Sequence, residues 1–290
     1  MIFKSLQLRS APSSTKCGKL YGRQEEVRQI REAIGGAAYD ATRNMDPTKQ
    51  IVLVDGISGV GKTSLIQEAL ATTSTGGKKF LLGRGKLLQS KTQHNPHAAL
   101  SHCLSQIVGQ ILHDPHLSEV LRVNLENGLS RSQIKGIAQL VPEILQLIPL
   151  PLDGSSHHGT RRNSKLIPLS LDVSSHHRRR RNGVTAGDAA KLQSAFRQLV
   201  EIIAAPQNVV LIIVLDDLQW INPSTMDVLQ ALASSSELKH FVILGSLRDS
   251  EVHGDHAMRR WMDKPLQENA TITQIHLSNF SLDQKLLERS

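Results

Sequence analysis

The stretch Gly56-Ile57-Ser58-Gly59-Val60-Gly61-Lys62-Thr63 decides the fold, because it fits the phosphate-binding pattern G-x-x-x-x-G-K-[ST]. It follows an apolar run at 51–54 and precedes a helical pattern at 62–71, which is the context that the pattern requires. Glycines permit backbone conformations closed to other residues, so successive N–H groups and the helix N-terminus can surround phosphate oxygens. We expect Lys62 to reach the β- and γ-phosphates, Thr63 to bind Mg²⁺, and Ser64 to complete the loop's contacts.

Two acidic residues predict where a cation is held. Asp216 and Asp217 directly follow the wholly aliphatic run at 209–215. Carboxylates at the end of a buried strand are costly unless a cation or hydrogen bonds receive them, and open α/β sheets bind ligands at that edge. We expect Asp216 to hold Mg²⁺ with Thr63, and Asp217 to orient or deprotonate an attacking water. An acidic pair that caps a helix is the alternative interpretation.

Strand-like and helical patterns alternate along the rest of the chain, which is typical of a parallel sheet covered by helices. Apolar runs predict strands near residues 51–54, 80–82, 209–215, 240–244 and 271–276. Helical patterns are found at residues 62–71, 96–112 and 186–204, and at Asn222-Pro223, where a cap precedes a first-turn proline. The prediction is an α/β fold, a three-layer αβα arrangement with a parallel sheet of about five strands.

Composition places the chain of 290 residues among ordinary globular proteins, since 39% of it is hydrophobic and 21% charged. This excludes the collagenous, wholly disordered and membrane-spanning classes. The run at 209–215 is far shorter than the roughly 20 residues that a bilayer crossing needs. Cys17 and Cys103 are too few for a disulfide framework, so we expect a reducing compartment, the cytoplasm or alternatively the nucleus, and no membrane partner.

A short segment is duplicated in tandem: LIPLPLDGSSHHGTRRN at 147–163 is followed by LIPLSLDVSSHHRRRRN at 166–182. One extra copy cannot build a solenoid, which needs about three or more units. Between residues 153 and 182 seven basic residues outweigh two acidic ones, which accounts for 5 of the net charge of +8. We therefore predict a basic surface insertion at about 147–184.

The insertion leaves two other interpretations open. The run Arg178, Arg179, Arg180 and Arg181 could be a nuclear-import signal or a patch that binds nucleic acid, although no aromatic residue accompanies it. The other alternative is a metal site formed by His157, His158, His176 and His177. Adjacent histidines in a loop lack the second-shell support that metal ligands usually have.

Four segments resemble successive motifs of the origin-recognition-complex-like AAA ATPase domain, in the STAND and AAA+ branch of P-loop NTPases. They are LYGRQEEVRQI from Leu20, GISGVGKTSL from Gly56, LDDLQWINPST from Leu215 and GSLRDSEV from Gly245. The likeness extends from about residue 20 to residue 284. It implies an ATPase domain at 19–290, interrupted by the insertion, with ATP and Mg²⁺ bound at Walker A and Walker B motifs. We expect the segment at 1–18 to be flexible.

The resemblance also implies roles for single residues. It places the strand at 240–244 between the phosphate-loop strand and the Asp216 strand, so that Ser246 or, preferably, Arg248 senses the γ-phosphate. Arg248 paired with a neighbouring acid is the alternative. Tyr21 and Gly22 match the family's adenine-side box, although Tyr21 could equally be a core aromatic.

These observations predict a Mg²⁺-dependent, ATP-binding and ATP-hydrolysing module that switches a signalling or regulatory assembly. Its catalytic residues would be Lys62, Asp217 and Arg248, and its partners other proteins or further copies of itself. A non-catalytic adaptor is the main alternative, and a DNA-loading ATPase a lesser one. Two departures favour slow turnover. Asp217 stands where many relatives carry Glu, and the chain ends soon after its last strand, so we expect no complete C-terminal lid.

Overall fold

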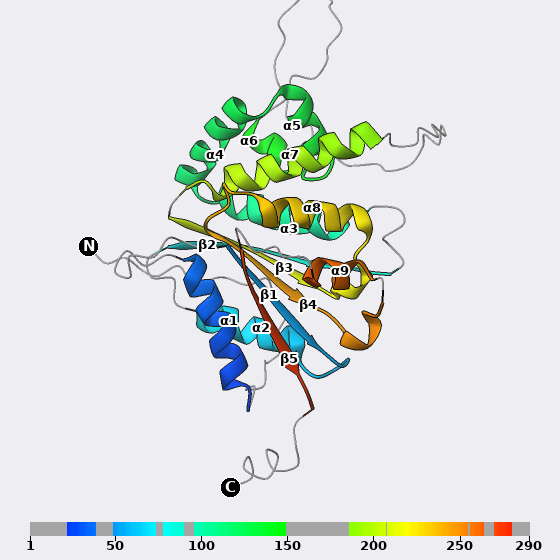
Figure 1. The fold of residues 1–290 in the computed structure, drawn as a ribbon. Helices are drawn as coiled ribbons and strands as arrows, with labels where there is room; N and C mark the ends of the chain where they lie inside the picture. The colour runs from blue at the N-terminus through cyan, green and yellow to red at the C-terminus, as the bar shows by residue number, and fades with distance from the viewer. Residues whose placement is uncertain are drawn as a thin grey trace, which may run out of the picture.

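A five-stranded parallel sheet with the strand order β2-β3-β4-β1-β5 forms the centre of the computed structural model (Figure 1). The structure describes residues 22–38, 49–73, 78–89, 96–148, 186–206, 208–254, 256–263 and 270–279. The strands are β1 (Lys49–Gly56), β2 (Lys79–Lys86), β3 (Val209–Asp216), β4 (Phe241–Ser246) and β5 (Ala270–Leu277). This confirms the predicted α/β fold. As the resemblance implied, β4 lies between β1 and β3.

Side chains of the central strands alternate between the two faces of the sheet, and both faces are buried. In β1, Val52 and Val54 pack on one face with helices α1 (Gln24–Ala37) and α2 (Lys62–Thr72). Ile51 and Leu53 pack on the other face. Because neither face is solvated, these strands are continuous apolar runs rather than alternating ones.

The second face is covered by a thicker layer of helices. Figure 1 shows α3 and α8 next to the sheet, with α4 to α7 stacked beyond them. The helices on this side are α3 (Ala98–Leu112), α4 (Pro115–Gly128), α5 (Arg131–Ala138), α6 (Ile144–Leu147), α7 (Ala186–Ala204), α8 (Pro223–Ser234) and α9 (Ala257–Asp263). Asn222 caps α8 as predicted, since its side chain accepts a hydrogen bond from the Thr225 N–H.

Helices α4, α5 and α6 were not predicted from the sequence, although signals for two of them are present. Asp114 precedes Pro115 and accepts hydrogen bonds from two backbone N–H groups of the first turn of α4. Ser130 and Gln133 form a reciprocal capping box at the start of α5. Helices α1 and α9 were not predicted either, and α1 begins after Arg23, whose side chain makes no capping hydrogen bond.

The outer edge of β2 is covered by α3. The side-chain amides of Gln106 and Gln110 pair with the backbone N–H and C=O groups of Arg84 and Leu82, respectively, as a neighbouring strand would. An added Cβ at Gly83 would lie 2.4 Å from the Cys103 carbonyl oxygen. The helix therefore packs directly on the strand and covers the middle of its outer edge, which leaves less of that edge open to pairing with another chain.

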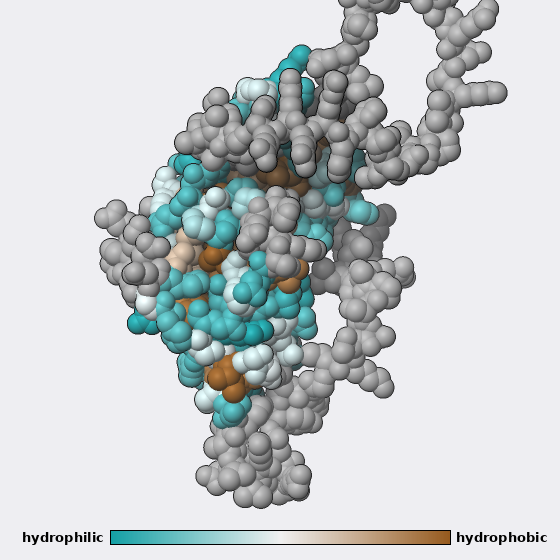
Figure 2. Space-filling view, turned by 90° about the vertical axis from the view of Figure 1, so that its right-hand side faces the viewer, coloured by the Kyte–Doolittle hydropathy of each residue, from teal (hydrophilic) through white to brown (hydrophobic). Residues whose placement is uncertain are grey.

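The surface of the described residues is mostly polar. On the face shown in Figure 2, hydrophilic residues predominate and hydrophobic ones form small, separate groups. The exposed large hydrophobic residues belong to four different elements or loops, and they are Ile57, Leu88, Val123 and Leu145. Within the described ranges, no helix is both long enough and apolar enough to cross a bilayer.

Several sequence predictions fall outside the described residues. These are the segment at 1–18, Tyr21, and the greater part of the insertion at 147–184, with its histidines and the run from Arg178 to Arg181. The insertion's predicted first residue, Leu147, is the last residue of α6.

Candidate active site

The loop between β1 and α2 has the backbone conformation that its glycines were expected to allow. The φ angles of Gly56, Gly59 and Gly61 are 142°, 80° and 99°. An added Cβ at Gly56 would also lie 2.4 Å from the Leu277 carbonyl oxygen, so glycine is required there on two counts. The loop ends at the first turn of α2, whose backbone N–H groups have no partner within the helix. This end of α2 can therefore receive an anion.

Lys62 is buried at the start of α2 and reaches back across the loop. Its Nζ donates to the carbonyl oxygens of Gly56 and Ile57, both at 2.8 Å. Burial lowers the pKa of Lys62, and the positive charge of Arg248 adds to this effect. An ammonium has three N–H donors, so one remains for a phosphate oxygen.

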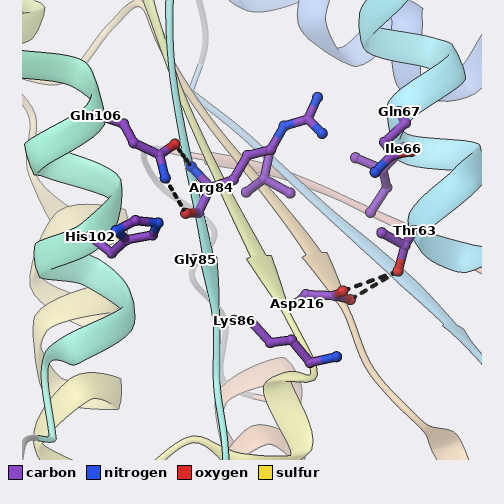
Figure 3. Close-up of a pocket in the computed structure, with 10 residues that line it drawn as sticks. Thr63, Ile66, Gln67, Arg84, Gly85, Lys86, His102, Gln106 and Asp216 are labelled. Carbon is purple, nitrogen blue, oxygen red and sulfur yellow. Dashed lines mark hydrogen bonds between the residues drawn. The ribbon is translucent and has the colours of Figure 1, made fainter. Parts of the chain in front are cut away.

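The side-chain oxygens of three residues meet where β3 and β4 end, beside the first turn of α2. The Thr63 hydroxyl lies 3.1 Å and 3.3 Å from the two carboxylate oxygens of Asp216 (Figure 3). The Ser246 hydroxyl donates to Asp216 Oδ1. Mg²⁺ prefers oxygen ligands and is commonly held by one or two of them together with substrate phosphates. The Thr63 and Asp216 oxygens therefore fit this ion.

Asp217 is the one non-glycine residue with a positive φ angle in the part of the chain that the structure describes, at φ 60° and ψ 49°. Its Oδ1 accepts from Gln219 at 3.1 Å, and its Oδ2 lies 3.1 Å from Lys86 Nζ. Burial alone would raise the pKa of Asp217, but the Gln219 and Lys86 contacts and the charge of Arg248 outweigh it and lower the pKa. The carboxylate is thus held ionised by its contacts with Gln219 and Lys86.

Two roles were predicted for Arg248, a sensor of the γ-phosphate and a partner of a neighbouring acid, and its contacts bear on both. Its NH1 donates to Glu251 at 2.7 Å, as the surface-pair alternative expected, while its Nε lies 3.9 Å from Asp217 Oδ1. Its backbone N–H donates to the Gln219 side chain at 3.2 Å. The guanidinium is half-buried and its charge acts on both Asp217 and Lys62.

Gly22 lies at the same edge of the sheet as the loop. The next residue, Arg23, donates to the Ser278 carbonyl oxygen just beyond β5, and β5 pairs Leu277 with Gly56. An adenine-side role was predicted for Gly22 from the family resemblance. That role, like those of the other site residues, stays a prediction.

Three residues beside the site were not found from the sequence. Lys86 was missed because the predicted strand stopped at residue 82, whereas β2 continues to Lys86, in register with Asp216. Gln219 lies in the motif LDDLQW but had no assigned role. Asp55 is a buried carboxylate just before the loop, and it accepts hydrogen bonds from Gln274 and His276 of β5. An acid within an apolar run was the available signal for Asp55.

The parallel sheet and the glycine-rich loop define an α/β protein of the P-loop NTPase type. More particularly, the chain belongs to the AAA ATPase domain family, which matches residues 19–244. This confirms the resemblance seen in the sequence motifs.

Other similarities are weaker. Hybrid signal transduction histidine kinase G of Dictyostelium discoideum is 26% identical over 226 residues, which are 75% of this chain and 5% of that protein. Among solved structures, Cdc6p of Pyrobaculum aerophilum is 15% identical with a TM-score of 0.45, over 96% of this chain and 52% of that one. The Aeropyrum pernix Orc1 protein in complex with DNA is 15% identical with a TM-score of 0.40, over 93% of this chain and 49% of that one.

Proposed function

We propose that the chain is a Mg²⁺-dependent module that binds and hydrolyses ATP and whose nucleotide state switches a signalling or regulatory assembly. The observation that carries this proposal is the convergence of Thr63, Asp216 and Ser246 beside the loop that holds Lys62. Lys62 would bind the β- and γ-phosphates, and Thr63 and Asp216 would hold Mg²⁺, which offsets the charge that develops on the phosphoryl oxygens. Asp217 would orient the attacking water and Arg248 would sense the γ-phosphate.

The weak similarity to a signal transduction kinase supports the regulatory part of this proposal. The chain spans only 5% of that protein, so the assembly and the signal are inferred and not transferred. We infer ATP and not GTP because the sequence lacks an Asn/Thr-Lys-x-Asp element for reading guanine.

One observation favours a second candidate, a nucleotide-binding adaptor without hydrolysis. Both carboxylate oxygens of Asp217 already have partners, Gln219 and Lys86. These contacts lower the pKa of Asp217 and so make its carboxylate a weaker general base. If these contacts persist with ATP bound, Asp217 activates water poorly, and nucleotide binding is the main activity of the site.

Single-turnover phosphate release separates the two candidates. With Mg²⁺ present and the purified chain in excess over ATP, phosphate release should be slow, at below about 1 s⁻¹. Asp217→Asn is the matched control, because it keeps the shape of the side chain and tolerates the positive φ. Release by the wild-type chain that exceeds that of Asp217→Asn supports the ATPase, whereas equal release by both supports the adaptor.

A further inference from the structure

A pocket of about 260 Å³ lies between α2 and the layer formed by β2 and α3, next to the proposed Mg²⁺ site (Figure 3). Ile66 and Gln67 of α2 line one side of it, and Arg84 and His102 come from β2 and α3. Thr63 and Asp216 form its boundary with the Mg²⁺ site. The nucleotide's adenine is expected on the Gly22 side of the loop, so the pocket is a separate space.

Arg84 is one of the charged residues that line this pocket, with Lys86 and Asp216. Its side chain extends from β2 toward Ile66 and Gln67 (Figure 3). Its backbone N–H and C=O are both bonded to the Gln106 amide at 3.0 Å, which fixes the point where the side chain begins. Burial lowers the pKa of the Arg84 guanidinium, and no neighbouring charge of the described residues acts on it.

Each of the other arginines that are buried or half-buried in the described residues forms an ion pair with a carboxylate. Arg23 meets Glu26, Arg122 meets Glu119 and Glu126, Arg197 meets Glu201, and Arg248 meets Glu251. Arg84 has no such partner within the described residues, although even partial burial of a cation without a counter-charge is unfavourable. A ligand that supplies the missing anion would remove that cost.

We propose that this pocket binds a small organic carboxylate or phosphate, with Arg84 as the anchoring group. A guanidinium presents a planar fork of donors that matches the two oxygens of these groups. The volume equals roughly nine water molecules at liquid density, which suits a small molecule better than a folded segment. Ile66 and Val214 give part of the wall an apolar character for the ligand's carbon atoms.

The site goes beyond the proposed ATPase function, because it adds a second ligand beside the nucleotide. Its occupant would lie against Thr63 and Asp216, the two residues proposed to hold Mg²⁺. Any effect of the anion on Mg²⁺-ATP affinity must then be matched by an equal effect of Mg²⁺-ATP on anion affinity.

Calorimetric titration of the full chain tests the proposal, with the loop first saturated with Mg²⁺ and ATPγS. The test ligands are inorganic phosphate, succinate, glycerol 3-phosphate and, for an acidic side chain of a protein, a polyglutamate peptide. We expect at least one small anion to bind one to one, and Arg84→Met to weaken it by about tenfold or more. Arg122→Met removes an arginine outside the pocket and should change nothing.

Gln67→Glu keeps Arg84 and places a carboxylate on the wall of the same pocket. This variant should also abolish anion binding, and it tests the proposal if Arg84→Met fails to fold. Repeating the titration on Lys62→Ala without nucleotide separates this pocket from the loop, because anion binding should persist there even if ATP binding is lost. No binding by any small anion, binding unchanged in both pocket variants, or binding by the peptide alone would overturn the proposal.

Discussion

Asp216 and Asp217 are neighbours in the sequence with different surroundings, and this difference assigns them different roles. Asp216 accepts hydrogen bonds from the hydroxyls of Thr63 and Ser246 and borders the first turn of α2. Asp217 has a positive φ angle and meets Lys86, Gln219 and Arg248. A hard cation is therefore expected on Asp216, and a role in handling water on Asp217.

Asp217→Asn should slow steady-state phosphate release by about 10²- to 10⁴-fold while leaving the affinity for Mg²⁺-ATP within about twofold. The substitution removes the negative charge and not the backbone conformation, because Asn also tolerates the left-handed region. Asp216→Asn is the comparison, and it should weaken Mg²⁺-dependent binding itself. Identical behaviour of both variants in binding and release would show that the division of roles is wrong.

Lys49 is a buried cation far from the loop, at the opposite end of β1. Its Nζ donates to the carbonyl oxygens of Ala233 and Ser235 at 2.6 Å each, which closes the C-terminal end of α8. Burial lowers the pKa of Lys49 to about 8. A neutral amine still carries two N–H donors, enough for both carbonyls.

The lowered pKa of Lys49 predicts that the stability of the folded chain depends on pH. Between pH 8 and about 10.4 the unfolded chain binds a proton at this residue that the folded chain does not, so the free energy of unfolding rises with pH. The rise from this group is at most about 1.4 kcal/mol per pH unit. Urea unfolding at pH 8.0 and at pH 9.5 gives this rise for the wild type and for Lys49→Met. The rise should be larger in the wild type. Parallel changes in both proteins would contradict the assignment.

At the scale of elements, β2 shows what close packing requires of the sequence. Its residues Gly83 and Gly85 face α3 so closely that a Cβ on either would lie 2.4 Å from a backbone carbonyl oxygen of the helix. The same helix caps the strand's outer edge through Gln106 and Gln110. The strand and the helix are therefore held in one relative position, and this position shapes the pocket around Arg84.

Gly83→Ala and Gly109→Ala form a matched pair of substitutions. A methyl group at Gly83 meets the Cys103 backbone, so we expect a loss of stability of about 1–3 kcal/mol from overpacking. Gly109 lies inside α3 with nothing within 4 Å of an added Cβ, so the same change should stabilise by about 0.5–1 kcal/mol. Chemical denaturation measures both. Equal effects would mean that α3 does not press on β2 as described.

The sequence predicted best the elements that directly precede or follow a motif of the proposed site. The helix at 62–71 and the strand at 209–215 agree with α2 and β3 to within a residue or so, because glycines or acids end the apolar runs sharply. The end of β2 was placed four residues early, since the small and charged residues from Gly83 to Lys86 do not read as a strand. Their place in the sheet depends on contact with α3, which no local pattern contains.

At the scale of the whole molecule, the sheet gathers residues from distant parts of the chain. Lys62, Asp216 and Arg248 come together because parallel strands all end at one edge, and the strand order brings β4 between β1 and β3. The sequence predicted this gathering through the family resemblance. It did not predict the contacts of Asp217, which depend on side-chain packing across that edge.

Removing residues 154–182 should leave ATP affinity unchanged and shift the thermal midpoint by only a few degrees. The deleted stretch lies outside all the motifs of the site, and loop length itself has a small effect on stability. A titration with a fluorescent ATP analogue and a thermal unfolding scan compare the two chains. A large loss of affinity or of the cooperative transition would show that the duplicated segment packs against the domain.

The most direct test of the central claim, that this chain binds nucleotide phosphates at Lys62 with the help of Mg²⁺, is a titration with a fluorescent ATP analogue. The wild type should bind it more tightly with Mg²⁺ than with EDTA. Lys62→Ala should lose at least about tenfold in affinity, because the lost ammonium is the group expected to bind the phosphates. The change in thermal stability should be smaller, since in the folded chain the ammonium donates to two carbonyl oxygens of the loop. Affinity equal to that of the wild type in Lys62→Ala, or no binding by the wild type, would contradict the account.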